Sequence, residues 1–144
     1  MIDTLIPTAT NTVEEDNSVV NDFEYATQPA YTYKLNIESE RVAGYVDELE
    51  AYKQAVYKIL NTERYEHIIY SWNYGIELKE LFGQPIPYVI PELERRITEA
   101  VMTDDRTESV SNFEFDTSKK RTVHVTFTVH TIFGDIEEEK VVNF

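Results

Sequence analysis

Carboxylic acids and aromatic rings gather in one stretch of this chain, ILNTERYEHIIYSWNYGIEL, at residues 59–78. Glycosidases place two carboxyl groups across one sugar-binding cleft and keep one of them protonated by desolvation. One hypothesis is therefore a muralytic, lysozyme-like glycosidase that uses Glu63 and Glu66. The alternative is that the rings pack or contact a partner protein while both acids face solvent. The rings that follow these acids are Tyr70, Trp72 and Tyr74.

Other catalytic and metal-binding patterns are missing from the sequence. The chain has no cysteine, which excludes disulfides, thiolate catalysis and zinc–cysteine sites. His124 and His130 fall on one face of a predicted strand, six residues or about 20 Å apart, too far to share a metal ion. No Gly-x-Ser-x-Gly turn or glycine-rich phosphate loop occurs. We therefore predict no cofactor, no metal and no small-molecule substrate.

The charge of the chain opposes binding to polyanions. Its 144 residues carry 13 basic and 27 acidic side chains, a net charge of −14. Nucleic acids and anionic membranes attract proteins mainly through phosphate, so we expect neither as a partner. No apolar run reaches the roughly 20 residues of a membrane span, and the N-terminus lacks a basic signal region. These features favour a soluble protein that is made in the cytosol.

Composition divides the chain into an arm and a folded part. Residues 1–33 hold six acids and no Lys or Arg, and Thr, Asn and acids dominate residues 8–18. Such polar segments cannot bury enough apolar surface to fold. We predict a flexible acidic arm at residues 1–18 and a single domain at residues 19–144.

The first half of that domain shows two strand patterns and one helix pattern. Residues 22–26 and 30–37 alternate between apolar and polar side chains, which predicts strands. A helix is predicted near residues 47–62, with Asp47 as N-cap and Glu50 completing a capping box. The apolar residues at helical spacing on its inner face are Leu49, Tyr52, Val56, Ile59 and Leu60.

The middle of the chain predicts shorter elements. Residues 66–72 are expected to be extended and buried, and residues 75–83 to form a short helix between two glycines. The segment QPIPYVIP is expected to be a stiff connector, because each proline biases its predecessor away from helix. Pro91 then suits the first turn of a helix near residues 89–102.

Alternation with period two dominates the C-terminal third. We predict a β-hairpin of residues 109–116 and 121–133, followed by a strand at 136–144. The strand at 121–133 is either central and fully paired, or part of an edge that accepts a partner's strand by β-augmentation. Its inward-facing residues are Val123, Val125, Phe127 and Val129. Together the elements predict an α+β fold, with helices packed on one face of a small, mostly antiparallel sheet.

Three segments in fixed order carry a resemblance to a known family: AVYKILNTERYEHIIYSWNYGIELKELFG, ELERRITEAVMTDDRTESVSNFEF and VHVTFTVHTIFGDI. The series resembles the phage baseplate wedge family that is related to the sheath initiators of contractile tails, historically labelled lysozyme-like. The resemblance covers roughly residues 45–140, and DFEYATQPAYTYKLN upstream is similar to the subgroup from phages of Gram-positive bacteria. It implies a fold like the strand-exchanging domain of tail sheath proteins.

The resemblance also suggests which residues matter. Thr62-Glu63-Arg64 would end the first helix, and Tyr74-Gly75 would begin the next segment. Asp105-Arg106 would take the place of the family's Glu-Pro-Arg signature, without its rigid proline. There Arg106 would either grip a partner's carboxylate with two hydrogen bonds or cap the carbonyls of the preceding helix.

The function implied is assembly without catalysis. The chain would be a structural part of a phage or phage-like tail baseplate, made in the host cytoplasm, that docks to wedge, sheath and tube proteins and initiates the sheath by strand augmentation. A regulatory adaptor that is absent from the particle is a further alternative. The expected protein contacts are Glu63, Arg64, Trp72, Tyr74, Asp105, Arg106, Val123, Val125, Phe127 and Val129.

Overall fold

The computed structural model describes residues 30–144, so the predicted arm at 1–18 and the predicted strand at 22–26 lie outside the described residues. The described part holds helices and strands in separate runs, which confirms the predicted α+β class. The helices are α1 (Glu48–Leu60), the short 3-10 helix η1 (Lys79–Leu81) and α2 (Ile86–Val101). The strands are β1 (Thr32–Asn36), β2 (Arg41–Val46), β3 (Thr107–Asp116), β4 (Thr122–Thr131) and β5 (Gly134–Asn143).

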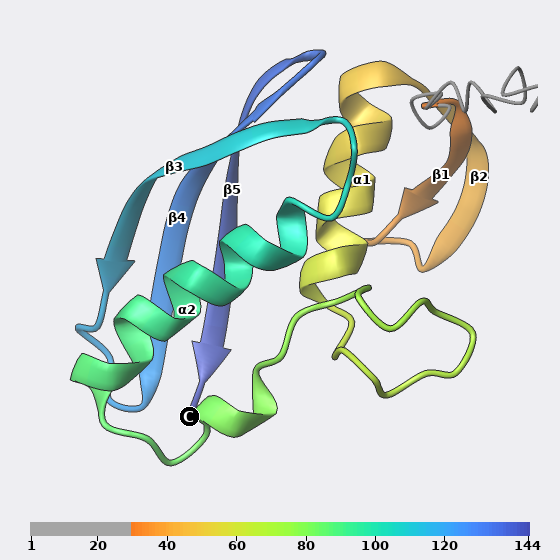
Figure 1. The fold of residues 1–144 in the computed structure, drawn as a ribbon. Helices are drawn as coiled ribbons and strands as arrows, with labels where there is room; N and C mark the ends of the chain where they lie inside the picture. Colours follow the sequence, from red (N-terminus) through yellow and green to blue (C-terminus); the bar gives the residue numbers. More distant parts are fainter. Residues whose placement is uncertain (1–29) are drawn as a thin grey trace, which may run out of the picture.

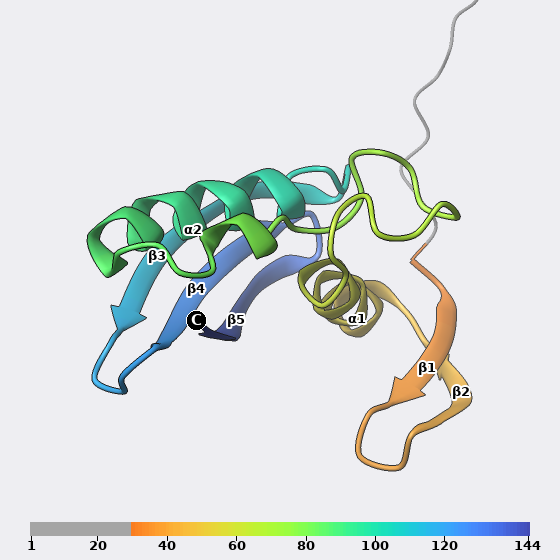
Figure 2. The ribbon, with the colours of Figure 1, turned by 90° about the horizontal axis from the view of Figure 1, so that it is seen from below.

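The strands form two antiparallel sheets on either side of α1 (Figure 1). In the larger sheet β4 is central, with β3 on one side and β5 on the other. Helix α2 lies across one face of this sheet, and α1 runs alongside β5 (Figure 2). The β1–β2 hairpin projects from the far side of α1. No helix of residues 30–144 is both long and apolar enough to cross a membrane.

The core lies between α2, α1 and the inner face of β4. Every second residue of β4 is buried, as the alternation predicted. The inner stripe of α1 is also as predicted, because Tyr52, Val56, Ile59 and Leu60 are buried and Leu49 is partly buried. Helix α2 contributes the stripe Val89, Leu93, Ile97, Ala100 and Val101. The predicted core is therefore confirmed, and it positions the sheet against both helices.

The start of α2 differs from the prediction. The helix begins at Ile86 inside the expected connector, so Pro87 occupies its first turn and Pro91 lies inside it. Pro87 costs little there, because N–H groups of the first turn have no partner within the helix. The buried side chain of Val89 compensates for the hydrogen bond that Pro91 cannot make, since it extends the apolar stripe by one turn.

The first half of the described chain holds a hairpin of which only one strand was predicted. Strand β1 confirms the pattern at 30–37, whereas β2 was missed because Gly44 interrupts its alternation. Gln54 of α1 fastens the hairpin: its Oε1 accepts the Leu35 N–H at 2.7 Å and its Nε2 donates to the Tyr33 carbonyl at 2.8 Å. Asp47 is the N-cap of α1, as predicted. Its carboxylate accepts the N–H of the next residue, Glu48, and not one further into the first turn.

The segment between α1 and η1 was predicted wrongly. Residues 66–72 form turns and are exposed instead of extended and buried. Residues 75–83 form a helix only at η1, one 3-10 turn long. A short apolar run has no periodicity of its own that distinguishes a buried strand from an exposed turn. The result is a long loop that projects beside α1 (Figure 1).

Candidate protein-interaction surfaces

The first candidate surface is this loop, and Glu63 holds its neck closed. The Glu63 carboxylate accepts the N–H of Leu78 at 3.1 and 3.2 Å and the N–H of Lys79 at 3.1 Å. Charged acceptors make the stronger backbone hydrogen bonds. Both carboxylate oxygens are thus occupied by the chain itself. Glu66, its partner in the glycosidase hypothesis, is exposed and pairs with Lys79 at 3.4 Å.

Arg64 ties the same neck to helix α2. Its side chain is buried, and it donates to the carbonyl of Gly75 at 3.2 Å and to Oε1 of Glu99 at 2.7 Å. Glu77 lies 3.4 Å from the same guanidinium. Burial disfavours the charged form, but the bonds to Glu99 outweigh it and hold the pKa of Arg64 above its ordinary value. Arg64 therefore has an internal structural role in the folded chain.

The backbone of the neck is closed by a short two-stranded contact. The N–H of Ile76 donates to the carbonyl of Thr62 at 2.9 Å, and the N–H of Arg64 donates to the carbonyl of Ile76 at 3.1 Å. Gly75 makes this approach possible, because its φ is +95° and a Cβ there would lie 2.6 Å from the Thr62 carbonyl oxygen. Only glycine adopts such a position without strain.

The predicted aromatic contacts on this loop have different environments. Trp72 is exposed, with 76% of its surface accessible. Tyr74 is half-buried and stacks on Tyr70, with ring centroids 4.5 Å apart. Burial is the main cause that raises the pKa of the Tyr74 hydroxyl. Trp72 is available to a partner, whereas Tyr74 supports the loop from inside.

The Asp104–Arg106 turn between α2 and β3 binds its own arginine. Arg106 is buried and grips Asp104 with two hydrogen bonds, Nε to Oδ1 at 2.8 Å and Nη2 to Oδ2 at 2.6 Å. The guanidinium also lies 5.4 Å from the centre of the Tyr52 ring. The carboxylate that Arg106 binds here is that of Asp104, two residues earlier in the same chain. Asp105 is exposed beside it.

Electrostatics make this turn a stable unit. Burial alone would raise the pKa of Asp104, but the bonds from Arg106 outweigh it and lower that pKa below its ordinary value. The hydrogen bonds to Asp104 raise the pKa of Arg106 in turn. Burial raises the pKa of Tyr52 to about 12, and its hydroxyl is 2.6 Å from Oγ1 of Thr107. The turn thereby joins α1 to the start of β3.

The four predicted contacts on β4 lie in the core. Their side chains are buried between the sheet and α2, and β4 pairs on both sides. Of the two alternatives for this strand, the central, fully paired one is the observed one. The residues concerned are Val123, Val125, Phe127 and Val129. The outer edges of this sheet belong to β3 and β5, and these four side chains support the sheet from inside.

The two edges of this sheet differ in access. Helix α1 runs alongside β5, and Lys140 Nζ donates to Asn61 Oδ1 at 2.7 Å across that contact. Strand β3 pairs with β4 alone, and its register shifts between Thr107 and Ser109 and again between Ser111 and Glu114. Such irregularities protect an edge from indiscriminate pairing. Of the two outer edges of this three-stranded sheet, that of β3 is the more accessible.

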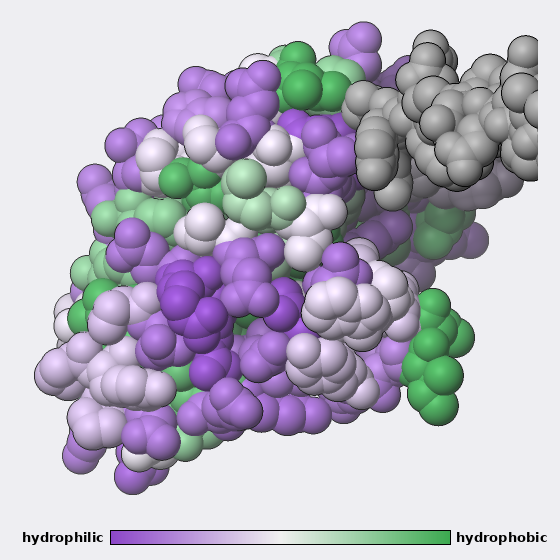
Figure 3. Space-filling view, in the orientation of Figure 1, coloured by the Kyte–Doolittle hydropathy of each residue, from purple (hydrophilic) through white to green (hydrophobic). Residues whose placement is uncertain are grey.

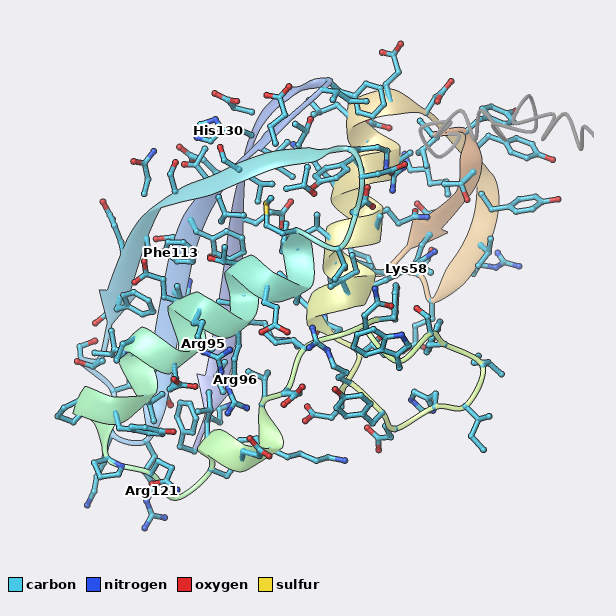
Figure 4. The ribbon with its side chains drawn as sticks, in the orientation of Figure 1. Lys58, Arg95, Arg96, Phe113, Arg121 and His130 are labelled. Carbon is cyan, nitrogen blue, oxygen red and sulfur yellow. The ribbon has the colours of Figure 1, made fainter. Side chains whose placement is uncertain are left out.

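The sheet face away from α2 is polar. His130 of β4 bridges its two neighbouring strands, with Nδ1 2.7 Å from Asp135 Oδ1 and Nε2 2.8 Å from Ser111 Oγ. His124 Nε2 lies 2.9 Å from Glu139 Oε2. A hollow of about 570 Å³ on this face is lined mainly by Thr and Glu side chains. Both histidines of β4 are thus engaged by neighbouring strands, and His130 is labelled in Figure 4.

No group of three metal-ligating side chains comes together within residues 30–144. The main cavities of that part are lined by residues other than Glu63 and Glu66. These two acids therefore lie outside those cavities, and Glu63 binds backbone N–H groups. This arrangement favours the alternative in which neither acid does chemistry.

Residues that the sequence did not single out complete the neck. Arg96 of α2 is buried and donates to the carbonyl of Glu77 at 2.7 Å and to Oε2 of Glu80 at 2.9 Å. Figure 4 shows Arg95 and Arg96 next to each other on α2. The sequence signal that could have identified Arg96 is a pair of adjacent arginines next to Ile97, a residue of the helix's apolar stripe. An arginine beside such a stripe carries its stem into the core.

Comparison with known proteins places these features in a family context. The family model for contractile injection system sheath initiators matches residues 20–134. The phage-like element PBSX protein XkdS of Bacillus subtilis (strain 168) is 37% identical over 119 residues, which cover 80% of this chain and 84% of that protein. The family match includes the loop neck, the Asp104–Arg106 turn and strands β3 and β4.

Proposed function

Because the chain belongs to the sheath-initiator family of contractile injection systems, we propose that it is a structural component of a phage or phage-like contractile tail baseplate. It docks to other baseplate wedge proteins and initiates sheath assembly by pairing one of its strands with a strand of a partner. It is made in the bacterial host cytoplasm and ends in the tail baseplate. Its partners are wedge, sheath and tube proteins.

The accessible outer edge of β3 is the observation that supports strand pairing most directly. Added strands gain main-chain hydrogen bonds along an exposed edge, and pockets for alternate side chains give specificity. The opposite edge, on β5, is flanked by α1 and linked to it through Lys140 and Asn61. The partner strand therefore lies along β3. The bulges there restrict regular pairing to short segments such as Ser109–Ser111.

The experiment uses two neighbouring proline variants, Ser109→Pro and Val110→Pro, in a strain that makes the particles but lacks the native chain. Successive N–H groups of a strand point to opposite sides. One proline therefore removes a hydrogen bond to β4, and the other removes an N–H that points away from β4; the latter is the outward variant. The outward variant should keep the wild-type melting temperature and lose sheathed tails in electron micrographs. If the outward variant melts like wild type and still forms normal sheaths, strand pairing at β3 is contradicted.

We propose that the chain acts without catalysis. Glu63 supports this, because both of its oxygens are used to close the loop neck. Purified protein should leave suspended cell walls turbid, and lysis that disappears in Glu63→Gln or Glu66→Gln would restore the glycosidase hypothesis. The adaptor alternative is separated by composition, since an adaptor is absent from purified particles and a baseplate component is present in fixed copy number.

A further inference from the structure

The loop between α1 and η1 carries two isoleucines at its tip that the strand-pairing role does not use. Ile68 has an accessible surface of 102% and Ile69 of 86%. The N–H of Tyr70 donates to the carbonyl of His67 at 3.2 Å, so both isoleucines occupy the corner of a tight turn. In the space-filling view, apolar side chains project on the side of the molecule where this loop lies (Figure 3).

The residue types at this corner are unfavourable for a free surface turn. Turn corners favour Gly, Pro, Asn, Asp and Ser, whose backbones or side chains suit the conformation. Two adjacent β-branched aliphatic residues have neither property, and together they place a large apolar surface in water. Nothing in the packing of residues 30–144 explains them, because both side chains point away from the core. An external contact does explain them.

The loop is built to present this tip in one orientation. Behind the turn, the Tyr70 ring stacks on Tyr74 at 4.5 Å and meets the His67 ring edge-on at 6.1 Å. The neck is closed by Glu63 and by the buried guanidinium of Arg64. A preorganised loop loses little conformational entropy when it docks, which leaves more of the contact energy for affinity.

Shape and charge identify the occupant as a protein. A projecting tip of two aliphatic side chains fits a concave apolar socket and not a flat surface. The bases at the two ends of the loop are already engaged, Arg64 with Glu99 and Lys79 with Glu66, and the chain carries a net charge of −14. An anionic membrane surface attracts free basic groups and repels a negatively charged chain, so lipid is disfavoured. A socket with Lys or Arg at its rim complements the negative charge of the chain.

A second copy of this chain fits less well. A stable interface needs about 800 Å² from each partner, far more than the tips of two loops supply when they meet symmetrically. The self-repulsion of two chains with a net charge of −14 each opposes the contact as well. The occupant is therefore a different subunit.

We propose that Ile68 and Ile69 form a plug that enters an apolar, basic-rimmed socket of a neighbouring structural protein of the tail. This inference rests on the proposed assembly function and assigns a contact separate from the edge of β3. The loop neck positions the plug, and the net negative charge of the chain favours the basic rim.

The test replaces both isoleucines in the full chain, Ile68→Ser with Ile69→Ser, and uses Ile132→Ser as a matched control. Ile132 is also an exposed isoleucine in a turn, at the β4–β5 connection. Purified variants should melt within about 2 °C of wild type, because exposed side chains contribute little to the fold. Particles from a complemented strain are then analysed by quantitative mass spectrometry. We expect at least a tenfold loss of the double variant per particle and wild-type copy number for the control.

The outcomes separate this inference from the proposed function. If the wild-type chain is itself absent from particles, the proposed function fails. If wild type and the double variant are incorporated equally, or the control is lost as strongly as the double variant, the plug fails while the function stands.

A photo-crosslinker, benzoylphenylalanine at position 68, identifies the socket in assembled particles. The expected product joins this chain to another tail protein, at a peptide near Lys or Arg. A product between two copies of this chain overturns the inference. So does flotation of the purified wild-type protein, but not of the double variant, with phosphatidylcholine–phosphatidylglycerol vesicles.

Discussion

The guanidinium of Arg64 lies 2.7 Å from the carboxylate of Glu99, a residue 35 positions later in the chain. This ion pair fixes the neck of the exposed loop to helix α2, which itself covers the sheet. Two surfaces proposed for docking, the loop tip and the edge of β3, are therefore held by one framework. Their relative position is set by buried contacts and does not depend on a partner.

Replacing Arg64 should destabilise the fold. Arg64→Met removes the bonds to Gly75 and Glu99, and we expect a loss of about 2 kcal/mol in the free energy of unfolding, measured by urea denaturation. Arg95→Met is the matched control, because Arg95 also pairs with Glu99 but is exposed. Exposed pairs contribute at most about 1 kcal/mol. Equal losses in both variants would contradict the role assigned to burial of Arg64.

Alanine variants of two glycines test the close approach of Gly75 to the Thr62 carbonyl in the loop neck. Gly75→Ala meets both a positive φ and the Thr62 carbonyl, whereas Gly44→Ala meets a positive φ of +80° with nothing within 4 Å. Positive φ alone costs roughly 1–2 kcal/mol for a residue with a Cβ. We expect Gly44→Ala to cost about 1 kcal/mol and Gly75→Ala about 3 kcal/mol, since overpacking adds to the strain. Similar melting temperatures for the two variants would show that the neck opens more easily than described.

The Asp104–Arg106 pair should make stability depend on pH in the acid range. The pKa of Asp104 is lowered in the folded chain, so its contribution is complete above the ordinary value of 3.8 and is lost as the pH falls through the folded-state value. Asp104→Asn should cost about 2 kcal/mol at pH 7, because it leaves the buried Arg106 without its counter-charge. The difference from wild type should shrink in melts below pH 3.8. A difference that is constant from pH 7 to pH 3 would exclude this ion pair as the cause.

Glu138 of β5 should behave in the opposite way. Burial raises its pKa, so its contribution to stability is complete below the ordinary value of 4.5 and is lost as the pH rises through the folded-state value. Glu138→Gln should therefore stabilise the chain slightly at pH 7, because solvent screens this partly exposed group, with a smaller gain at pH 4.5. Glu137→Gln, on the exposed face of the same strand, is the control with a smaller effect. Calorimetry at both pH values measures the difference, and a gain that grows toward low pH would contradict the assignment.

Periodicity predicted most of the fold, because burial on one face leaves a regular pattern in α1, β3, β4 and β5. It missed β2, where Gly44 breaks the alternation, and it misplaced the start of α2, where Val89 extends the buried stripe past two prolines. It also wrongly predicted a buried strand at residues 66–72, because two adjacent isoleucines give the same sequence pattern whether they are buried or exposed. Whether they are exposed depends on the tertiary structure.

For three of the predicted contact residues, the structure shows partners within the chain itself. Glu63, Arg64 and Arg106 are central to the two turns that frame the surface, but each binds a group of its own chain. Glu99 lies 35 positions after Arg64, a separation that no local motif encodes, whereas Asp104 is only two residues before Arg106. The order of segments along the chain, which carried the family resemblance, identifies these residues. It does not show which side chains contact each other.

The most direct measurement of the central claim is a cryo-electron microscopy map of purified tails at the end of the sheath nearest the baseplate. We expect this chain between the baseplate and the first ring of sheath subunits, with a strand of another protein paired along the outer edge of β3. A map in which the first sheath ring begins without this chain, or in which the edge of β3 faces solvent, would contradict it.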